Sequence, residues 1–312
     1  MKKILIKRLY IPIYCLLFLA SGFFSSLEAS SLFEQQPKRI ISTSPSITEI
    51  LFELGLQDRI VAVTDFCTYP EEACHLPSVG GVLNPDIETI VSLTPDLIIH
   101  QSDSAKMEKN IKSLGIPTLS IKVRTVSDIF ESINRLGKEL NCQENAKKLL
   151  LLLEGKINSY KQRLSGRSPK KVLLLLGDSS DPARDLYAVG PGTFLNELLV
   201  LSGGINILKN SKAQYPKLSK EFIIEQSPEI IIEAGPNSNL PQKEIDYRVE
   251  QWNRFPTIQA VKDKRIHFIS ADYILIPGPR LVKILEKFAK VIHPDLSHSE
   301  TEKTSFLETA KP

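Results

Sequence analysis

Polar and aromatic side chains follow several of the strands that the sequence predicts. One group comes from the first half of the chain and one from the second half: Ser44, Asp65, Tyr69, Gly81 and Gln101, then Asp178, Tyr215, Asp272, Tyr273 and Arg280. Ligands of open α/β sheets collect outside the carboxyl ends of the strands, so these residues are candidates for a binding site. Aromatic side chains that face each other across a cleft suit a large, flat ligand. Each residue taken alone is more often an ordinary loop residue.

Motifs that carry catalysis are missing from this sequence. It contains no P-loop, no G-x-S-x-G and no G-x-G-x-x-G after a strand. The five histidines fit no metal-binding motif, so neither a catalytic set nor a metal site is predicted. His100 follows a predicted strand and is a ligand-binding candidate, with a solvated loop histidine as the alternative. Residues 190–193, Gly-Pro-Gly-Thr, precede a helix and form either an anion-binding turn or a plain turn.

A segment of twelve residues occurs twice. Residues 88–99 read ETIVSLTPDLII and residues 221–232, which begin 133 residues further on, read EFIIEQSPEIII, with five of twelve positions identical. Proline disfavours helical backbone in the residue before it, so we expect Thr94 and Ser227 to end two helices. The apolar runs that follow are typical of parallel strands covered on both faces. A repeat at this distance predicts two lobes of related design.

Glu88 and Glu221 hold the same place in the two copies, seven residues before the proline. An acid in the first turn of a helix is favoured by about 0.3–1 kcal/mol through the helix dipole, which explains one such residue. It explains less well why both copies carry one at the same register. We expect the pair to present two matched anions to a dimeric, basic partner.

Strands alternate with helices along the rest of the chain, which predicts an α/β fold with mainly parallel sheets. In the first half, strands are expected at residues 39–42, 59–63, 97–99 and 118–121. Residues 126–164 contain no proline and have apolar residues at helical spacing, which predicts one long helix with a break expected, if anywhere, near Asn141. Its leucine run, residues 149–153, predicts burial on more than one side. We therefore divide the chain into an N-terminal lobe, a connecting helix and a C-terminal lobe, at residues 37–125, 126–165 and 169–294.

The N-terminus has the pattern of an export signal. Four basic residues lie within the first eight positions, an apolar run covers residues 11–24, and Ala29 offers a small residue for cleavage. A membrane anchor is the alternative, but the run is short and contains Pro12. Cys15 lacks the small residues that lipidation needs before it. We predict a signal peptide at residues 1–29 and a periplasmic protein.

Charge and cysteine content limit the partners and the cross-links. The chain holds 39 Lys and Arg against 36 Asp and Glu, and residues 1–29 carry four of the bases and one acid, so the mature protein is formally neutral. This balance does not favour nucleic acid as a partner. Cys67 and Cys74 lie in one loop and are a candidate disulfide in an oxidising compartment, with two buried thiols as the alternative. Cys142 would stay free. Residues 295–312 are polar and predicted to be disordered.

Several blocks of sequence resemble the class III substrate-binding proteins of ABC importers, the group for cobalamin, haem and ferric siderophores. The resemblance covers about residues 37–294, and its blocks are STSPSITEIL at 42–51, VTDFCTYP at 63–70, PSVGG at 77–81, PGPRLV at 277–282 and HP at 293–294. The last two look like the ending of cobalamin-binding members.

The resemblance implies two Rossmann-like lobes joined by one long α-helix, with the ligand held between them and no enzyme activity. It also implies a monomer that delivers its ligand to the permease dimer of an ABC importer and its ATPase. In that family a glutamate on each lobe docks on permease arginines, and Glu88 and Glu221 occupy those positions. No cofactor is expected beyond the transported ligand, a corrinoid or an iron chelate.

The resemblance indicates the family clearly, but it indicates the ligand less clearly. The cobalamin-binding members place tryptophans around the corrin, whereas Val82 and Tyr215 stand near those places here and the single tryptophan is Trp252. A corrinoid is the first expectation. Haem-binding relatives coordinate the iron through tyrosine or histidine, and this chain has Tyr215, Tyr273 and His100 as candidates for that role. Haem is therefore an alternative ligand, as is a ferric siderophore. An exported enzyme that uses the cleft is a further alternative.

Overall fold

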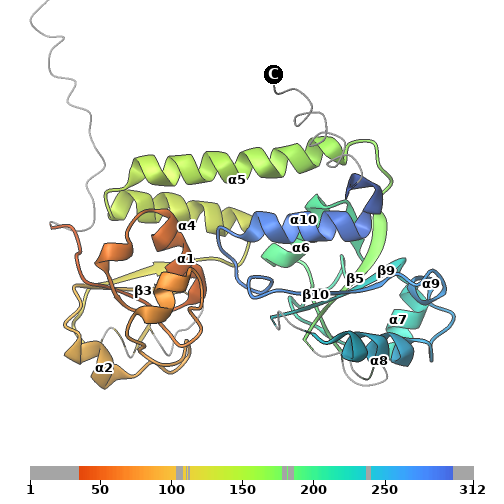
Figure 1. The fold of residues 1–312 in the computed structure, drawn as a ribbon, viewed down its shortest axis with the longest axis horizontal. Coiled ribbons are helices and arrows are strands. Elements are labelled where there is room, and N and C mark those ends of the chain that lie inside the picture. The colour runs from red at the N-terminus through yellow and green to blue at the C-terminus, as the bar shows by residue number, and fades with distance from the viewer. Residues whose placement is uncertain are drawn as a thin grey trace, which may run out of the picture.

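The computed structural model describes residues 35–102, 108, 109, 111, 113–177, 181, 186–236 and 240–297. The predicted export signal, Asp178 and the tail beyond residue 297 lie outside this part of the chain. Figure 1 shows two α/β lobes side by side, with one long helix running along both of them. The predicted fold class is confirmed, with a parallel sheet in the first lobe and a mixed sheet in the second.

The described part of the N-terminal lobe forms a parallel sheet with the strand order β2-β1-β3-β4. Its strands are β1 (Ile40–Ser42), β2 (Ile60–Ala62), β3 (Leu97–Gln101) and β4 (Thr118–Ile121). Its helices are α1 (Pro45–Glu53), η2 (Gln57–Arg59), η3 (Glu71–His75) and α2 (Ile87–Ser92). The predicted strands are all present, because their apolar runs are buried against the helices.

The described part of the C-terminal lobe forms a sheet with the order β10-β9-β5-β6-β8, and β7 also pairs with β5. Its strands are β5 (Lys170–Leu176), β6 (Leu186–Ala188), β7 (Gly204–Asn206), β8 (Lys217–Leu218), β9 (Ile230–Gly235) and β10 (Ile266–Ser270). Its helices are α6 (Phe194–Leu201), α7 (Lys220–Gln226), α8 (Gln242–Trp252), α9 (Gln259–Lys262), α10 (Leu281–Ile292) and η4 (Pro294–Ser297). Among these strands, β6 is the one that runs in the opposite direction, antiparallel to both of its neighbours, β5 and β8.

The sequence repeat is also a structural repeat. Helices α2 and α7 occupy its two copies, and each is followed by a strand, β3 or β9, that pairs in parallel with the first strand of its lobe, β1 or β5. Neither helix continues to its proline, since α2 ends at Ser92 and α7 at Gln226. The residue before each proline, Thr94 (φ 45°) or Ser227 (φ 40°), has a left-handed backbone. Both predicted helix ends are confirmed.

The acid that follows each proline makes the same kind of hydrogen bond in both lobes. The carboxylate of Asp96 accepts a hydrogen bond from the Arg39 amide at 2.9 Å. The carboxylate of Glu229 accepts one from the Lys171 amide at 2.8 Å. Each acid therefore ties the end of the repeat to the start of the neighbouring strand, and this bond explains why both copies retain an acid there.

The connection between the lobes consists of two helices rather than the single helix predicted over residues 126–164. Helix α4 (Val126–Glu139) packs against α5 (Gln143–Arg163), and the two lie along each other in Figure 1. The chain reverses at Asn141, whose φ is 56°. The Cys142 amide donates to the Gly137 carbonyl at 2.8 Å, the bond of a Schellman motif with asparagine in the left-handed position. After this reversal, α5 is the helix that leads the chain into the C-terminal lobe.

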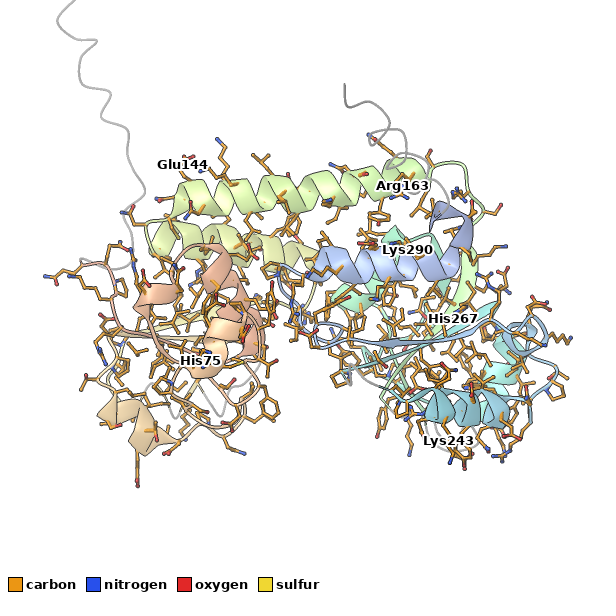
Figure 2. All side chains as sticks on the ribbon, viewed as in Figure 1. His75, Glu144, Arg163, Lys243, His267 and Lys290 are labelled. Carbon is orange, nitrogen blue, oxygen red and sulfur yellow. The ribbon has the colours of Figure 1, made fainter. Side chains whose placement is uncertain are left out.

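Helix α5 is anchored on both lobes. Near its start, Asn145 Nδ2 donates to the Leu54 carbonyl at 2.8 Å, and at its end Arg163 Nη2 donates to the Leu296 carbonyl at 3.2 Å. Figure 2 shows Glu144 and Arg163 at opposite ends of this helix, above different lobes. One cluster of buried apolar side chains continues from the first sheet through α4, α5, α6 and α10 to the second sheet.

Two expectations about these segments are corrected. Within the leucine run of α5, Leu151 and Leu152 are 60% and 56% exposed, so the helix is buried on one side only because nothing in the described chain covers its outer face. Residues 295–297, predicted to be disordered, belong to η4, and Leu296 is buried. Within the described ranges, none of the helices combines the length and the apolar character needed to span a bilayer.

Candidate functional site

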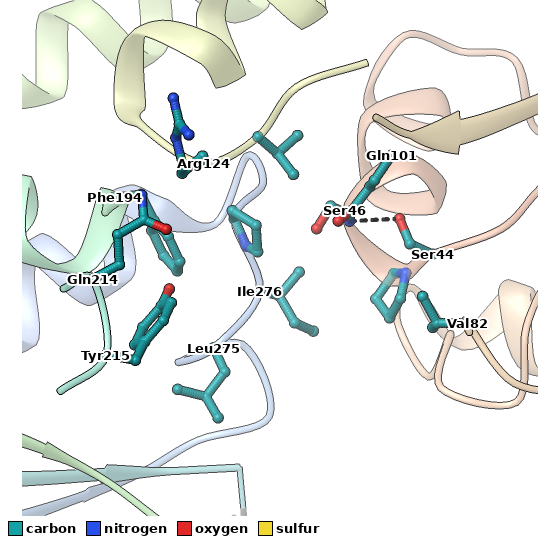
Figure 3. A pocket seen from close by; sticks show the side chains of 13 residues that line it. Ser44, Ser46, Val82, Gln101, Arg124, Phe194, Gln214, Tyr215, Leu275 and Ile276 are labelled. Carbon is teal, nitrogen blue, oxygen red and sulfur yellow. Dashed lines mark hydrogen bonds between the residues drawn. The ribbon is translucent and has the colours of Figure 1, made fainter. Parts of the chain in front are cut away.

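A cleft of about 360 Å³ lies between the two lobes. This volume is within the range of small-molecule sites, about 300–1,000 Å³. Both lobes contribute to its walls, as Figure 3 shows. The lining residues are Ser44, Pro45, Ser46, Val82, Gln101, Val123 and Arg124 from the N-terminal lobe, and Phe194, Gln214, Tyr215, Leu275, Ile276 and Pro277 from the C-terminal lobe.

The N-terminal wall is made by a strand end and a helix start. Gln101 ends β3, and its Nε2 atom donates to Ser44 Oγ at 3.0 Å. Ser44 precedes α1, whose first residue is Pro45. Because proline has no amide hydrogen and fixes φ for the first helical turn, this start holds Ser44 and Ser46 in place at the cleft. Val82 completes this wall from the loop before α2.

The C-terminal wall carries the aromatic side chains. Phe194 is buried at the start of α6, and its amide donates to the Arg124 carbonyl at 2.7 Å. Tyr215 is 48% exposed and projects beside Gln214 and Phe194 in Figure 3. Partial burial raises the pKa of the Tyr215 phenol, so the side chain is a neutral hydrogen-bonding group at neutral pH.

The Gly-Pro-Gly-Thr segment positions this wall and does not present a free helix end. The Thr193 hydroxyl accepts a hydrogen bond from the Asn196 amide at 3.2 Å and so caps α6 itself. The Gly190 amide donates to the Gln214 carbonyl at 2.6 Å, and Gln214 Nε2 donates to the Gly192 carbonyl at 3.0 Å. The segment is therefore the turn that holds Gln214 and Tyr215 at the cleft.

Replacing Gly190 by alanine should disturb both stability and the cleft. A Cβ atom at Gly190 would overlap the carbonyl oxygen of Ala213, which is backbone and must shift. Overpacking of this kind costs about 1–3 kcal/mol. We expect urea denaturation to show this loss of unfolding free energy, and ligand titration to show weaker binding because Tyr215 moves. Gly235→Ala is the control, since a Cβ there meets nothing within 4 Å, and equal effects of both changes would contradict the prediction.

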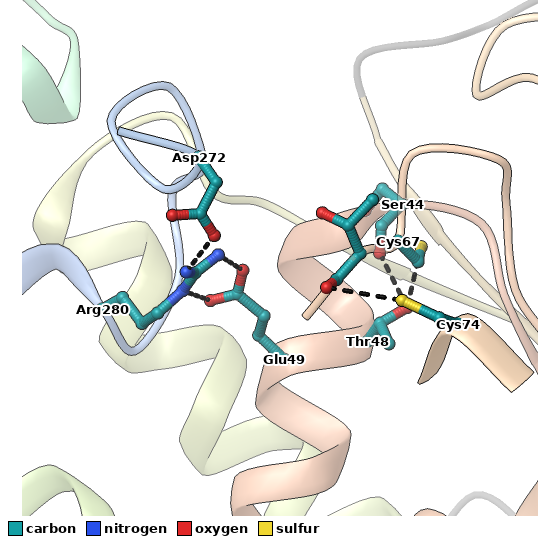
Figure 4. Close-up of polar contacts among 8 residues, drawn as sticks. Ser44, Thr48, Glu49, Cys67, Cys74, Asp272 and Arg280 are labelled. Atoms are coloured by element: carbon teal, nitrogen blue, oxygen red, sulfur yellow. Dashed lines mark hydrogen bonds and ion pairs between the residues drawn. The ribbon is translucent and has the colours of Figure 1, made fainter. Parts of the chain in front are cut away.

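Four of the predicted ligand-binding residues lie together, outside the residues that line the cleft. Tyr69, Asp272 and Tyr273 surround the guanidinium of Arg280. Figure 4 shows Arg280 between Asp272 and Glu49, which was not among the predicted site residues. These side chains bind one another, and the geometry of the cluster is given below.

Asp65, Gly81 and His100 also fall outside the lining residues. The carboxylate of Asp65 accepts a hydrogen bond from the Ser78 hydroxyl, and Gly81 precedes the lining residue Val82. His100 is 1% exposed, so it is not the solvated loop histidine considered as an alternative. Its Nδ1 atom lies 3.1 Å from the Gln101 carbonyl oxygen. Of the predicted ligand-binding residues, Ser44, Val82, Gln101 and Tyr215 line the cleft.

The candidate disulfide is not formed, because Cys67 and Cys74 are both free thiols. The Cys67 sulfur is buried, accepts a hydrogen bond from the Thr48 hydroxyl at 3.2 Å and shares a second one with the Thr64 hydroxyl, also at 3.2 Å. Cys74 is exposed in η3, which turns it towards solvent. The two thiols therefore have different environments. Cys142 is also free, as predicted. Within the described residues, no three His, Cys, Asp or Glu side chains are grouped so that they could hold a metal ion.

Glu88 and Glu221 occupy the same structural position in the two lobes. Each is the second residue of its helix, α2 or α7, and each is exposed. The first-turn amides are already capped by the side chains of Asp86 and Ser219. In Figure 1 both helices lie below the sheets, on the side away from α5. The repeat therefore places one exposed carboxylate on each lobe.

Sequence reasoning missed nine of the described lining residues. Arg124, Phe194, Leu275, Ile276 and Pro277 line the cleft, as do Pro45, Ser46, Val123 and Gln214. Two of them could have been found from the sequence. Gln214 is next to the predicted site residue Tyr215, and Pro277 lies in the PGPRLV block. Nothing in the sequence marks Phe194 as a site residue, because an apolar residue at a helix start looks like any core residue.

Two α/β lobes, a long helix along both and a cleft between them define a class III substrate-binding protein of ABC importers. The chain belongs to the periplasmic binding protein family, whose model matches residues 40–273. It is 30% identical over 270 residues to the uncharacterized ABC transporter substrate-binding lipoprotein YvrC of Bacillus subtilis, covering 84% of this chain and 82% of the relative.

Two further relatives differ in the ligand that they are named for. The vitamin B12-binding protein of Photorhabdus laumondii is 27% identical over 280 residues, covering 89% of this chain and 94% of the relative. The crystal structure of a periplasmic heme binding protein from Pseudomonas aeruginosa superposes with a TM-score of 0.70 at 20% identity, covering 83% of this chain and 93% of that one. The latter similarity shows the fold alone.

Proposed function

We propose that this protein captures a corrinoid in the cleft between its lobes and delivers it to the permease of an ABC importer. The observation that carries the proposal is the chemistry of the cleft walls. The described lining residues offer five neutral hydrogen-bonding side chains, beside apolar surface. They are Ser44, Ser46, Gln101, Gln214 and Tyr215. A corrin ring has apolar faces and amide groups at its rim, and such groups pair with hydroxyls and amides without needing charge.

The charge of the cleft favours this ligand class over anionic iron chelates. Arg124 is the single charged side chain among the described residues that line the cleft. A ferric siderophore that carries several negative charges would need several cations to replace the water that it loses on binding. A neutral or weakly charged ligand suits these walls better.

Haem is the second candidate, and the phenol of Tyr215 is the observation that favours it. Tyr215 stands at the cleft and is half-exposed, so an iron porphyrin could reach it. Arg124 could pair with one carboxylate of such a ligand.

The rest of the proposal concerns the localisation of the protein and its partners. The predicted signal would send the protein to the periplasm, where a monomer would dock through Glu88 and Glu221 on the two halves of a permease dimer with its ATPase. The capture of a ligand without chemical change is supported by the family, whose relatives are named as substrate-binding or vitamin B12-binding proteins. Turnover of a bound corrinoid by the purified protein would instead support an exported enzyme.

A ligand panel with one matched pair of variants tests the proposal. Isothermal titration with cyanocobalamin, haemin and a ferric siderophore should show tightest binding of the corrinoid. Tyr215→Ala should weaken that binding by about 1–3 kcal/mol, the scale of burying one large side chain. Tyr247→Ala is the control, because Tyr247 is also 48% exposed but lies on α8, away from the cleft. If haemin binds most tightly, the second candidate is correct, and if no ligand binds, the cleft is not the site.

A further inference from the structure

A buried ion pair crosses from one lobe to the other. Glu49 lies on α1 of the N-terminal lobe and Arg280 directly precedes α10 of the C-terminal lobe. Arg280 Nε donates to Glu49 Oε2 at 3.0 Å, and Arg280 Nη2 donates to Glu49 Oε1 at 2.6 Å. The side chains are 6% and 1% exposed. Figure 4 shows the two parallel bonds, the bidentate geometry that arginine and carboxylate form best.

Aromatic rings from both lobes enclose the guanidinium. Its central carbon lies 4.0 Å from the ring centroid of Tyr69, which belongs to the N-terminal lobe. It lies 5.2 Å from the ring centroid of Tyr273, which belongs to the C-terminal lobe. Both distances are those of cation–π contacts. Asp272 accepts a third hydrogen bond from Arg280 Nη1 at 2.5 Å. The cluster therefore fixes Arg280 from both sides of the lobe boundary.

The charged state of the buried Glu49 carboxylate depends on Arg280. Burial raises the pKa of the Glu49 carboxyl, and the hydrogen bonds and charge of Arg280 act in the opposite direction. Without Arg280, the buried carboxylate would lack its nearby positive charge and would favour the protonated form. A buried ion pair adds little net stability because desolvation offsets the attraction, but it is specific in geometry.

The pair lies close to both walls of the cleft in the chain. Ser46, which lines the N-terminal wall, is three residues before Glu49 on α1. Pro277, which lines the C-terminal wall, is three residues before Arg280. Between them, a Cβ atom at Gly278 would lie 3.4 Å from Glu49 Oε2, so the backbone of the second wall comes close to the carboxylate of the first lobe. A change in the pair must therefore change the spacing of the walls.

We propose that the Arg280–Glu49 pair is a positioning contact that sets the distance between the cleft walls, and with it the affinity for the ligand. The proposal rests on the proposed function of the cleft. It assigns Tyr69, Tyr273 and Asp272 to holding Arg280, in place of direct contact with ligand. It also gives the two parts of the PGPRLV block separate roles, because Pro277 lines the cleft and Arg280 binds Glu49 outside the lining residues.

A matched pair of variants separates positioning from stability. Arg280→Met removes the guanidinium at the lobe boundary. Arg248→Met removes one inside the C-terminal lobe, where Arg248 pairs with the buried Glu233 and with Glu244. Both changes remove a buried arginine whose side chain is at most 10% exposed, so both should lower the unfolding temperature. Only Arg280→Met should alter the spacing of the lobes.

Small-angle scattering of the ligand-free proteins is the first readout. We expect Arg280→Met to broaden the distance distribution relative to wild type and Arg248→Met to leave it unchanged. The second readout is affinity for cyanocobalamin, which should fall at least tenfold for Arg280→Met through faster dissociation, and less than threefold for Arg248→Met. Arg280→Lys keeps the charge without the bidentate geometry and should recover part of the affinity.

Glu49→Gln tests the same contact from the other lobe and keeps the volume of the side chain. It should broaden the scattering distribution as Arg280→Met does, and the double variant should be no worse than the poorer single variant. Unchanged scattering and affinity in folded Glu49→Gln would overturn the proposal. If wild type binds no member of the ligand panel, the proposed function fails, while ligand-free scattering still decides whether the pair sets the lobe spacing.

Discussion

The double change Glu88→Ala with Glu221→Ala should abolish most ligand-stimulated ATPase activity of the reconstituted transporter while leaving ligand affinity near that of wild type. Both carboxylates are exposed at the second position of their helices, on the side of the lobes away from α5. If the two glutamates dock on the permease as proposed, each change removes a charge-assisted contact with a permease arginine. Truncating one partner of such a buried pair costs about 2–5 kcal/mol, largely because the other charge is left unpaired.

The alternative explanation predicts a different result. If the two glutamates only favour the positive ends of α2 and α7, each change should cost about 0.3–1 kcal/mol of stability and leave transport intact. The side chains of Asp86 and Ser219 already cap these helices, which makes a large loss of stability unexpected. Glu144→Ala is the control, because Glu144 is an exposed first-turn acid of α5, on the opposite side of the molecule.

Charge reversal sharpens the test. Glu88→Lys with Glu221→Lys should be worse than the alanine pair, since it sets like charges against the basic partner. Ligand binding is measured alongside by titration, so that a misfolded variant is recognised. Normal ATPase stimulation by either double variant would show that the permease docks elsewhere.

Trp252→Ala should lower the free energy of unfolding by about 3–5 kcal/mol, the cost of replacing a buried tryptophan with alanine. Trp252 is 1% exposed in the core of the C-terminal lobe, and its ring meets Phe255 edge to face with 6.3 Å between centroids. Because it lies outside the residues that line the cleft, ligand affinity should stay near that of wild type below the unfolding transition.

Urea denaturation followed by circular dichroism measures this loss. Tyr247→Ala on the same helix is the control, because Tyr247 is half-exposed and a surface substitution is usually within about 0.5 kcal/mol. A strong effect of Trp252→Ala on ligand affinity, with little loss of stability, would mean that the single tryptophan serves the ligand after all.

Local rules made much of the fold predictable. The prolines of the repeat end their helices at Thr94 and Ser227, because the clash between a proline ring and the preceding residue acts within one peptide unit. The apolar runs became buried parallel strands, since a run without polar residues must be covered on both faces. Asn141 marked a weak point in the predicted long helix, but not the reversal of the chain, which depends on how α4 and α5 pack.

The candidate site was predicted less completely. Ser44, Gln101, Val82 and Tyr215 line the cleft, and all four were expected from strand ends or from the family resemblance. Other expected residues did not join them. The position at a strand end brings a residue to the correct edge of a sheet. Whether its side chain then faces the ligand or binds another side chain depends on segments that are distant in the sequence.

Arg280 illustrates the division between sequence and tertiary structure. By itself the sequence determined the two related lobes, the strand and helix pattern and the matched positions of Glu88 and Glu221, because these follow from contacts between neighbours in the chain and from an internal repeat. Glu49 and Arg280 are 231 residues apart, and nothing local marks them as partners. Only the packing of α1 against the segment before α10 excludes water there, and exclusion of water is what makes a buried carboxylate require that arginine.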